Sequence, residues 1–196
     1  ILREIRFSSI LKQSNFVKRE IGMSPYMIML HFLYMLLINK KISSFIKQSS
    51  EAYEKDVYYR HLKDTKYNWR KLLSLVSVKL INKLNPLQNQ KDIKVLIVDD
   101  TVEAKRGKQI EGSCKNLWSN KEKRAVNGLN IVSLNYSDSY TDLILDFSIS
   151  YNKNVFIKED EKLHHKSNSK KRRDEGYRGK NTLASDMVKR ALINGV

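Results

Sequence analysis

The sequence predicts a protein of the α/β class, in which a helical region precedes a sheet. As far as about Leu87, hydrophobic residues recur at three- and four-residue steps, the spacing of one helix face. After the polar segment 87–92, which is typical of a linker, short aliphatic runs indicate strands. The 196 residues suffice for a buried core. We therefore expect a helical domain over residues 1–90 and a sheet-containing domain over residues 91–196.

The helical region contains one especially clear helix, over residues 67–84. Its apolar residues form a single stripe, and Asn85-Pro86 ends it. Ser24-Pro25 is typical of a helix start, with serine as the N-cap and proline in the first turn. Further short helices are expected at 41–47 and 51–62.

The most apolar stretch of the chain is the 12-residue segment 27–38. A bilayer span needs roughly 20 apolar residues, so this segment predicts a buried core helix. His31 within it is expected to be a hydrogen-bonded core residue.

Three strands are expected in the second region. Residues 94–98 form an unbroken aliphatic run, which indicates a central strand covered on both faces. Segments 129–136 and 142–151 follow, and the polar turn 137–140 between them predicts a hairpin.

The remaining part of the chain is strongly charged before its last helix. Residues 158–180 are polar and highly charged, which predicts a loop or a poorly ordered insertion. A helix is then expected from a cap at Asn181 or Thr182 to the stop signal Asn194-Gly195. The chain ends where we expect another strand.

The charge of the chain points to a polyanionic partner. Lys and Arg number 37 against 21 Asp and Glu, a formal net charge of +16. Nucleic acid is the first expectation and an anionic membrane surface the second. The single cysteine, Cys114, excludes a disulfide scaffold and a cysteine-based zinc cluster, and we expect an inert thiol.

Two carboxylates, Asp99 and Asp100, end the first aliphatic run. Adjacent strand residues point to opposite faces, so only one of them can share a site with groups above that face. A carboxylate there suits Mg²⁺ or Mn²⁺, but such a site needs further acidic ligands. The alternative is that one aspartate caps a turn while the other is solvated.

A series of short motifs resembles one known family. Segments 95–112 and 127–149, with weaker support from 56–73, 170–180 and 190–196, are similar to the DDE-type transposases of bacterial insertion sequences. The motifs that carry the resemblance are, in order, Asp99-Asp100-Thr101, Lys105-Arg106, Gln109-Ile110-Glu111, Asn127-Gly128, Tyr136-Ser137-Asp138 and Leu145-Asp146-Phe147.

The resemblance implies a fold and an activity. The fold would be a helical N-terminal region followed by a truncated RNase H-like mixed sheet with a flanking helix. Asp100 would be the first of three acidic residues (Asp, Asp, Glu) that hold two Mg²⁺ or Mn²⁺ ions and cleave and join DNA strands at insertion-sequence ends. The second Asp would follow the last helix, and the Glu would come much later. We therefore expect an N-terminal fragment that is inactive alone.

Basic residues are candidates for DNA contacts. Lys105, Arg106 and Lys108 follow Asp100 and would neutralise backbone phosphates. The run Lys170, Lys171, Arg172 and Arg173 is either a solvated loop or a phosphate contact. The resemblance implies double-stranded DNA with terminal repeats as the partner, a homo-oligomeric synaptic complex, no membrane contact, and a bacterial, cytoplasmic and nucleoid-associated location.

Other residues allow other interpretations. Trp118, Tyr58 and Tyr59 are able to stack on bases, although core packing is favoured for both tyrosines. His164-His165 lacks a spaced third ligand and is expected to be solvated. Two alternatives to the enzyme fragment stay open: a non-catalytic basic nucleic-acid-binding protein, and a truncated regulator of a full-length transposase.

Overall fold

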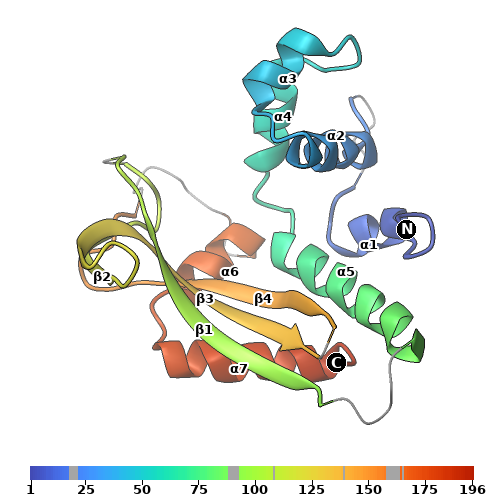
Figure 1. Ribbon diagram of the computed structural model, residues 1–196. Coiled ribbons are helices and arrows are strands. Elements are labelled where there is room, and N and C mark those ends of the chain that lie inside the picture. Colours follow the sequence, from blue (N-terminus) through green and yellow to red (C-terminus); the bar gives the residue numbers. More distant parts are fainter. Residues whose placement is uncertain (18–21, 88–92, 108, 139, 158–163, 165) are drawn as a thin grey trace. The chain divides into compact units, whose positions relative to one another are not determined.

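The computed structural model describes residues 1–17, 22–87, 93–107, 109–138, 140–157, 164 and 166–196. The described chain divides into two compact units, Ile1–Asn68 and Trp69–Val196. Figure 1 shows a helical first unit and a second unit built on a sheet. The predicted α/β class is thus confirmed. The predicted helical region, 1–90, includes a helix that belongs to the second unit.

The first unit consists of four helices: α1 (Phe7–Gln13), α2 (Pro25–Leu37), α3 (Ile42–Gln48) and α4 (Lys55–Leu62). As predicted, α2 begins at Pro25, directly after Ser24. One buried cluster joins α2, α3 and α4 through Ile28, Met35, Phe45 and Tyr58. In the described part of the chain, no helix has the length and apolar character that a membrane span requires.

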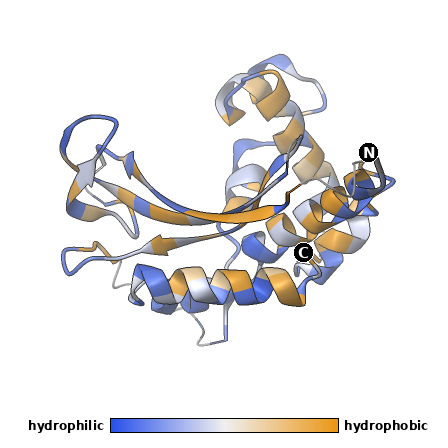
Figure 2. Cartoon of the chain, turned by 60° about the horizontal axis from the view of Figure 1, so that its bottom comes forward, coloured by the Kyte–Doolittle hydropathy of each residue, from blue (hydrophilic) through white to orange (hydrophobic). Residues whose placement is uncertain are grey.

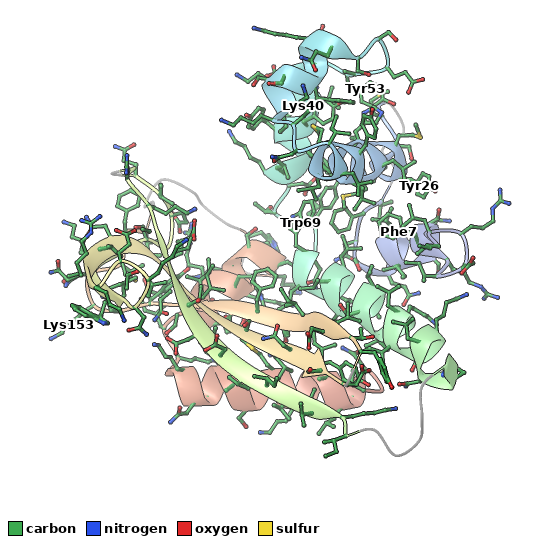
Figure 3. The ribbon with its side chains drawn as sticks, viewed as in Figure 1. Phe7, Tyr26, Lys40, Tyr53, Trp69 and Lys153 are labelled. Carbon is green, nitrogen blue, oxygen red and sulfur yellow. The ribbon has the colours of Figure 1, made fainter. Side chains whose placement is uncertain are left out.

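His31 lies inside this helical core, as the sequence predicted. Its Nδ1 is 2.8 Å from the hydroxyl of Tyr58, and its ring is 5.1 Å from that of Tyr53, which is labelled in Figure 3. Burial lowers the pKa of His31, although the charge of Glu51 opposes this effect. Tyr58 is fully buried as predicted, whereas core packing was wrong for Tyr59, which is 40% exposed.

The second unit contains a four-stranded sheet. The strands are β1 (Val95–Ala104), β2 (Cys114–Ser119), β3 (Arg124–Ser137) and β4 (Asp142–Ser150). The long strand β3 pairs with each of the other three, always antiparallel. The prediction of a mixed sheet is therefore wrong for the described strands. Short connections between consecutive strands produce antiparallel pairs, since a parallel pair needs a long crossover.

The first predicted strand differs from expectation in its surroundings. Within the described residues, β1 pairs only with β3 and is an edge strand, not a central one. Most of its side chains are exposed, and Val98 is 44% exposed. An aliphatic run indicates a strand, but it does not show which of its sides are covered.

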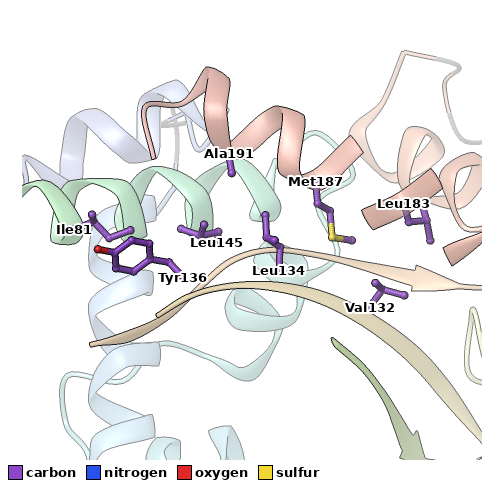
Figure 4. Packing of buried hydrophobic residues seen from close by; sticks show 8 residues of the cluster. All are labelled: Ile81, Val132, Leu134, Tyr136, Leu145, Leu183, Met187 and Ala191. Carbon is purple, nitrogen blue, oxygen red and sulfur yellow. The ribbon is translucent and has the colours of Figure 1, made fainter. Parts of the chain in front are cut away.

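Helices cover one face of the sheet. They are α5 (Trp69–Leu84), α6 (Asn168–Glu175) and α7 (Lys180–Ile193), with the short 3₁₀ turn η1 (Asn85–Leu87) after α5. The core between them and the sheet, shown in Figure 4, contains Ile81, Val132, Leu134, Tyr136, Leu145, Leu183, Met187 and Ala191. The β3 residues of this core, Val132, Leu134 and Tyr136, are alternate residues of the strand, so their side chains point to one face of the sheet. That face is the one that the helices cover. The fold is consistent with the predicted RNase H-like class.

The charged segment before the last helix is partly helical. The prediction of a loop over 158–180 is wrong for α6, where the Ser167 side chain accepts a hydrogen bond from the backbone N–H of Lys170. Residues 158–163 and 165 lie outside the described residues. The last helix begins at Lys180 with Gly179 as its N-cap, earlier than the predicted cap at Asn181 or Thr182.

Candidate active site and nucleic-acid interface

The register of β1 against β3 places the two neighbouring aspartates on opposite faces of the sheet. Asp100 lies opposite Val132, a residue of the core beneath the helices. Directly opposed residues in an antiparallel pair share a face, so Asp100 lies on the helix-covered face. Asp99 lies opposite Ser133 on the other face.

Asp100 forms an ion pair with a residue that the sequence did not single out. The Nζ atom of Lys180 donates a hydrogen bond to Oδ2 of Asp100 at 2.5 Å. Each side chain is 47% exposed. Lys180 is the first residue of α7. Because that helix packs on the sheet, the ammonium group of Lys180 lies next to the carboxylate of Asp100.

The carboxylates that the structure describes in the second unit are not gathered into one metal-binding cluster. Among the described residues, no group of three or more His, Cys, Asp or Glu side chains is placed to hold a metal ion. Asp142 accepts a hydrogen bond from Ser137 at the β3–β4 turn, and Asp146 is surrounded by arginines. Asp100 offers a hard-cation ligand, but the described residues do not complete a two-metal site.

Asp146 belongs to a buried ionic network that joins four elements. Arg70 of α5 contacts Oδ1 of Asp146 at 3.2 Å and both carboxylate oxygens of Glu175 at 2.8 Å. Arg190 of α7 donates to Oδ2 of Asp146 at 2.7 Å, and Arg172 pairs with Glu175 within α6. Asp146 and Glu175 are 4% and 5% exposed. The network therefore ties α5, α6 and α7 to β4.

Burial dominates the electrostatics of this network. Desolvation raises the pKa of Asp146 even though Arg70 and Arg190 favour its ionised form. Desolvation likewise lowers the pKa of Arg70, against the attraction of Asp146 and Glu175. The Leu-Asp-Phe motif thus supplies a structural carboxylate here, one that positions helices on the sheet.

The predicted basic residues differ in whether their charge is paired with that of an acidic side chain. Lys105 pairs with Glu103 at 3.1 Å, Arg106 is exposed, and Lys108 lies outside the described residues. On α6, Lys170 pairs with Asp174 and Arg172 with Glu175, while Arg173 pairs with Glu111. Lys171 alone of that run is exposed without an ion pair to a described residue.

The other residues singled out by the sequence stand as follows. Cys114 is fully buried, in agreement with an inert thiol. His164 is exposed, and His165 lies outside the described residues. Trp118 is 61% exposed.

Comparison with known proteins identifies the family. The DDE superfamily endonuclease family matches residues 40–196, which is most of the chain, and the chain belongs to this family. Endonucleases of this type act on DNA and generally use divalent metal ions. No curated protein and no solved structure matches the chain. The resemblance read from the sequence motifs is confirmed at the level of the family.

Proposed function

We propose that the chain is the DNA-binding and first catalytic part of an insertion-sequence transposase of bacterial origin. Asp100 is the first of the acidic residues of that enzyme, and the described residues do not complete the set with a second Asp and a Glu. Its substrate is double-stranded DNA at the terminal repeats of the element, in a synaptic complex of several copies. The helical region supplies part of the DNA contacts.

One observation carries the role of Asp100. Within the described residues it is a half-exposed carboxylate in the middle of an edge strand, on the face where α7 begins, and the ammonium group of Lys180 pairs with it. Asp99 next to it faces the other way. The ion pair at 2.5 Å holds a positive charge against this carboxylate, and this supports a role for Asp100 as a cation ligand.

The neighbouring aspartates give a matched test of this assignment. The affinity of residues 1–196 for duplex DNA is measured with and without Mn²⁺, in the wild type and in the variants Asp100→Asn and Asp99→Asn. Because a divalent ion held by Asp100 would add positive charge that attracts DNA phosphates, we expect Mn²⁺ to strengthen DNA binding in the wild type and in Asp99→Asn. Asp100→Asn should lose that gain while keeping its metal-independent binding.

Three outcomes contradict the proposal in different ways. Equal responses of the two variants to Mn²⁺ overturn the assignment of Asp100 and favour a non-catalytic nucleic-acid-binding protein. Nicking of terminal-repeat DNA by residues 1–196 with Mg²⁺, abolished in Asp100→Ala, overturns the fragment interpretation. Equal affinity for terminal-repeat and random DNA removes the support for an insertion-sequence substrate.

A further inference from the structure

Several exposed lysines among the described residues of the second unit lie on a hairpin that the sequence did not predict. It is formed by β2, the turn 120–123 and the first residues of β3, and we refer to residues 114–124 as the β2–β3 hairpin. Figure 1 shows β2 at the end of the sheet away from the C-terminus, and Figure 2 shows hydrophilic colours over the loops at that end.

The hairpin carries cations that are available to a ligand. Lys115, Lys121 and Lys123 are exposed, and none has an ion-pair partner among the residues that the structure describes. Arg124 is the exception, because it pairs with Glu122. On α6, by contrast, three of the four cations are already neutralised by carboxylates of the chain.

A neighbouring segment adds to this positive charge. The side chain of Asn152 donates to the backbone carbonyl of Lys115 at 3.0 Å, so the segment after β4 lies against β2. Lys153 follows, exposed and without an ion pair to a described residue; Figure 3 labels it at this end of the sheet.

The same hairpin also carries an exposed aromatic ring, that of Trp118. Trp118 is 61% exposed, and its Nε1 donates to Oδ1 of Asn120 at 3.1 Å. This hydrogen bond restrains the ring, which lowers the entropy lost when a flat ligand stacks on it. A hairpin that carries both an exposed tryptophan and exposed lysines is suited to a nucleic-acid strand, whose phosphates contact the lysines while a base stacks on the indole.

The hairpin continues directly into β3, the strand that pairs with β1. Val132 of β3 lies opposite Asp100, whereas Gly128 of the same strand lies opposite Cys114, the first residue of the hairpin, and Arg124 is the last residue of the hairpin. At about 3.4 Å per residue, the hairpin lies roughly 14 to 27 Å along β3 from the position of Asp100. That span corresponds to about four to eight nucleotides of DNA.

We propose that the β2–β3 hairpin binds a DNA strand, with Lys121 and Lys123 on its phosphates and Trp118 stacked on an unpaired base. The proposal rests on the proposed function, since that function supplies DNA as the partner. It places the principal DNA contact of the second unit on the hairpin rather than on α6.

Binding to a blunt duplex tests the lysines. In the double variant Lys121→Gln/Lys123→Asn, the affinity for the duplex should fall roughly tenfold. The dependence of that affinity on salt concentration should weaken by the amount expected for about two lost phosphate contacts. Lys123 has a φ of 52°, a conformation that asparagine adopts more readily than lysine, so this change should not unfold the turn. The control pair, Lys170→Gln and Lys171→Gln on α6, should reduce the salt dependence by about one contact at most.

Binding to the same duplex with a single-stranded overhang tests the tryptophan. Trp118→Ala should lower the affinity for the overhang by about fivefold or more and leave the blunt duplex nearly unchanged, while Trp118→Phe retains most of the affinity. Tyr140→Ala removes another exposed ring, 69% exposed in the β3–β4 turn, and should change neither affinity.

The outcomes separate this inference from the proposed function. If the wild-type chain binds DNA and the hairpin variants bind it equally well, or the α6 pair loses more affinity than the hairpin pair, the hairpin inference is wrong while the proposed function stands. If the wild-type chain binds no DNA, both fail together.

Discussion

The ammonium group of Lys180 lies 2.5 Å from the carboxylate of Asp100, across 80 residues of sequence. The two residues belong to different elements, since Lys180 begins α7 and Asp100 lies within β1. The lysine therefore neutralises the carboxylate that we propose as a metal ligand. A divalent cation arriving at Asp100 has to compete with this internal cation.

Removing the lysine charge should strengthen the binding of a divalent cation at Asp100. We expect Lys180→Gln to raise the Mn²⁺ affinity of the DNA-free chain by about 1.4-fold to fivefold, because a half-exposed ion pair contributes about 0.2 to 1 kcal/mol. The concentration of free Mn²⁺, followed by its paramagnetic resonance signal, gives this affinity. Lys189→Gln removes an exposed charge from the same helix and is the control. Equal affinities in the two variants would show that Lys180 does not compete with metal.

The buried network around Asp146 should be costly to break. In Asp146→Asn, Arg70 and Arg190 lose one of the two buried carboxylates that they share and keep only Glu175, which costs up to about 3 to 5 kcal/mol of unfolding free energy. Urea unfolding followed by tryptophan fluorescence reports on this unit, since Trp69 and Trp118 both lie in it. Asp174→Asn breaks only an exposed pair with Lys170 and should cost about 1 kcal/mol or less. A similar loss in both variants would contradict a structural role specific to Asp146.

Hydrophobic periodicity found the elements that bury a regular apolar face. The predicted strands 129–136 and 142–151 correspond to β3 and β4, and the predicted helix 67–84 corresponds to α5. It could not find β2, because a bulge at Asn116, with a φ of 57°, breaks the alternation.

Charge and long-range contacts were harder to predict. Helix α6 has no apolar stripe, and its buried residue is Glu175, held by arginines from other elements. The pair of Lys180 with Asp100 depends on how α7 packs, which no local pattern encodes. The choice of Asp100 as a candidate needed only the contiguous motif around it in the sequence, and its role stays a prediction.

Gly128 should tolerate no side chain, because β1 runs directly beside it. A Cβ atom built at Gly128 lies 2.2 Å from the backbone carbonyl oxygen of Glu103. Gly128→Ala therefore forces β1 away from β3 and should cost about 1 to 3 kcal/mol of stability. At Gly179 an added Cβ meets nothing within 4 Å, so Gly179→Ala should cost less than about 1 kcal/mol. Thermal unfolding of the two variants compares them, and an equal loss would show that strand approach is not the cause.

The buried His31 should make the helical unit less stable in mild acid. Burial lowers the pKa of His31 below its ordinary value of 6.5, so the unfolded chain binds the proton more readily than the folded one. The resulting stability is fully present above pH 6.5 and is lost as the pH falls toward the lowered pKa. The exchange rates of the amides in α2 and α4 are divided by the intrinsic rates of unprotected amides at the same pH. These corrected rates should increase as the pH falls from 7 to 5.

Replacement of the histidine isolates its contribution to this pH dependence. His31→Gln keeps a polar partner for the Tyr58 hydroxyl but cannot take up a proton, so its corrected exchange should vary much less with pH. His164→Gln changes an exposed histidine and should leave the wild-type dependence intact. A pH dependence that persists in His31→Gln would mean that another group, not His31, is charged as the helical core opens.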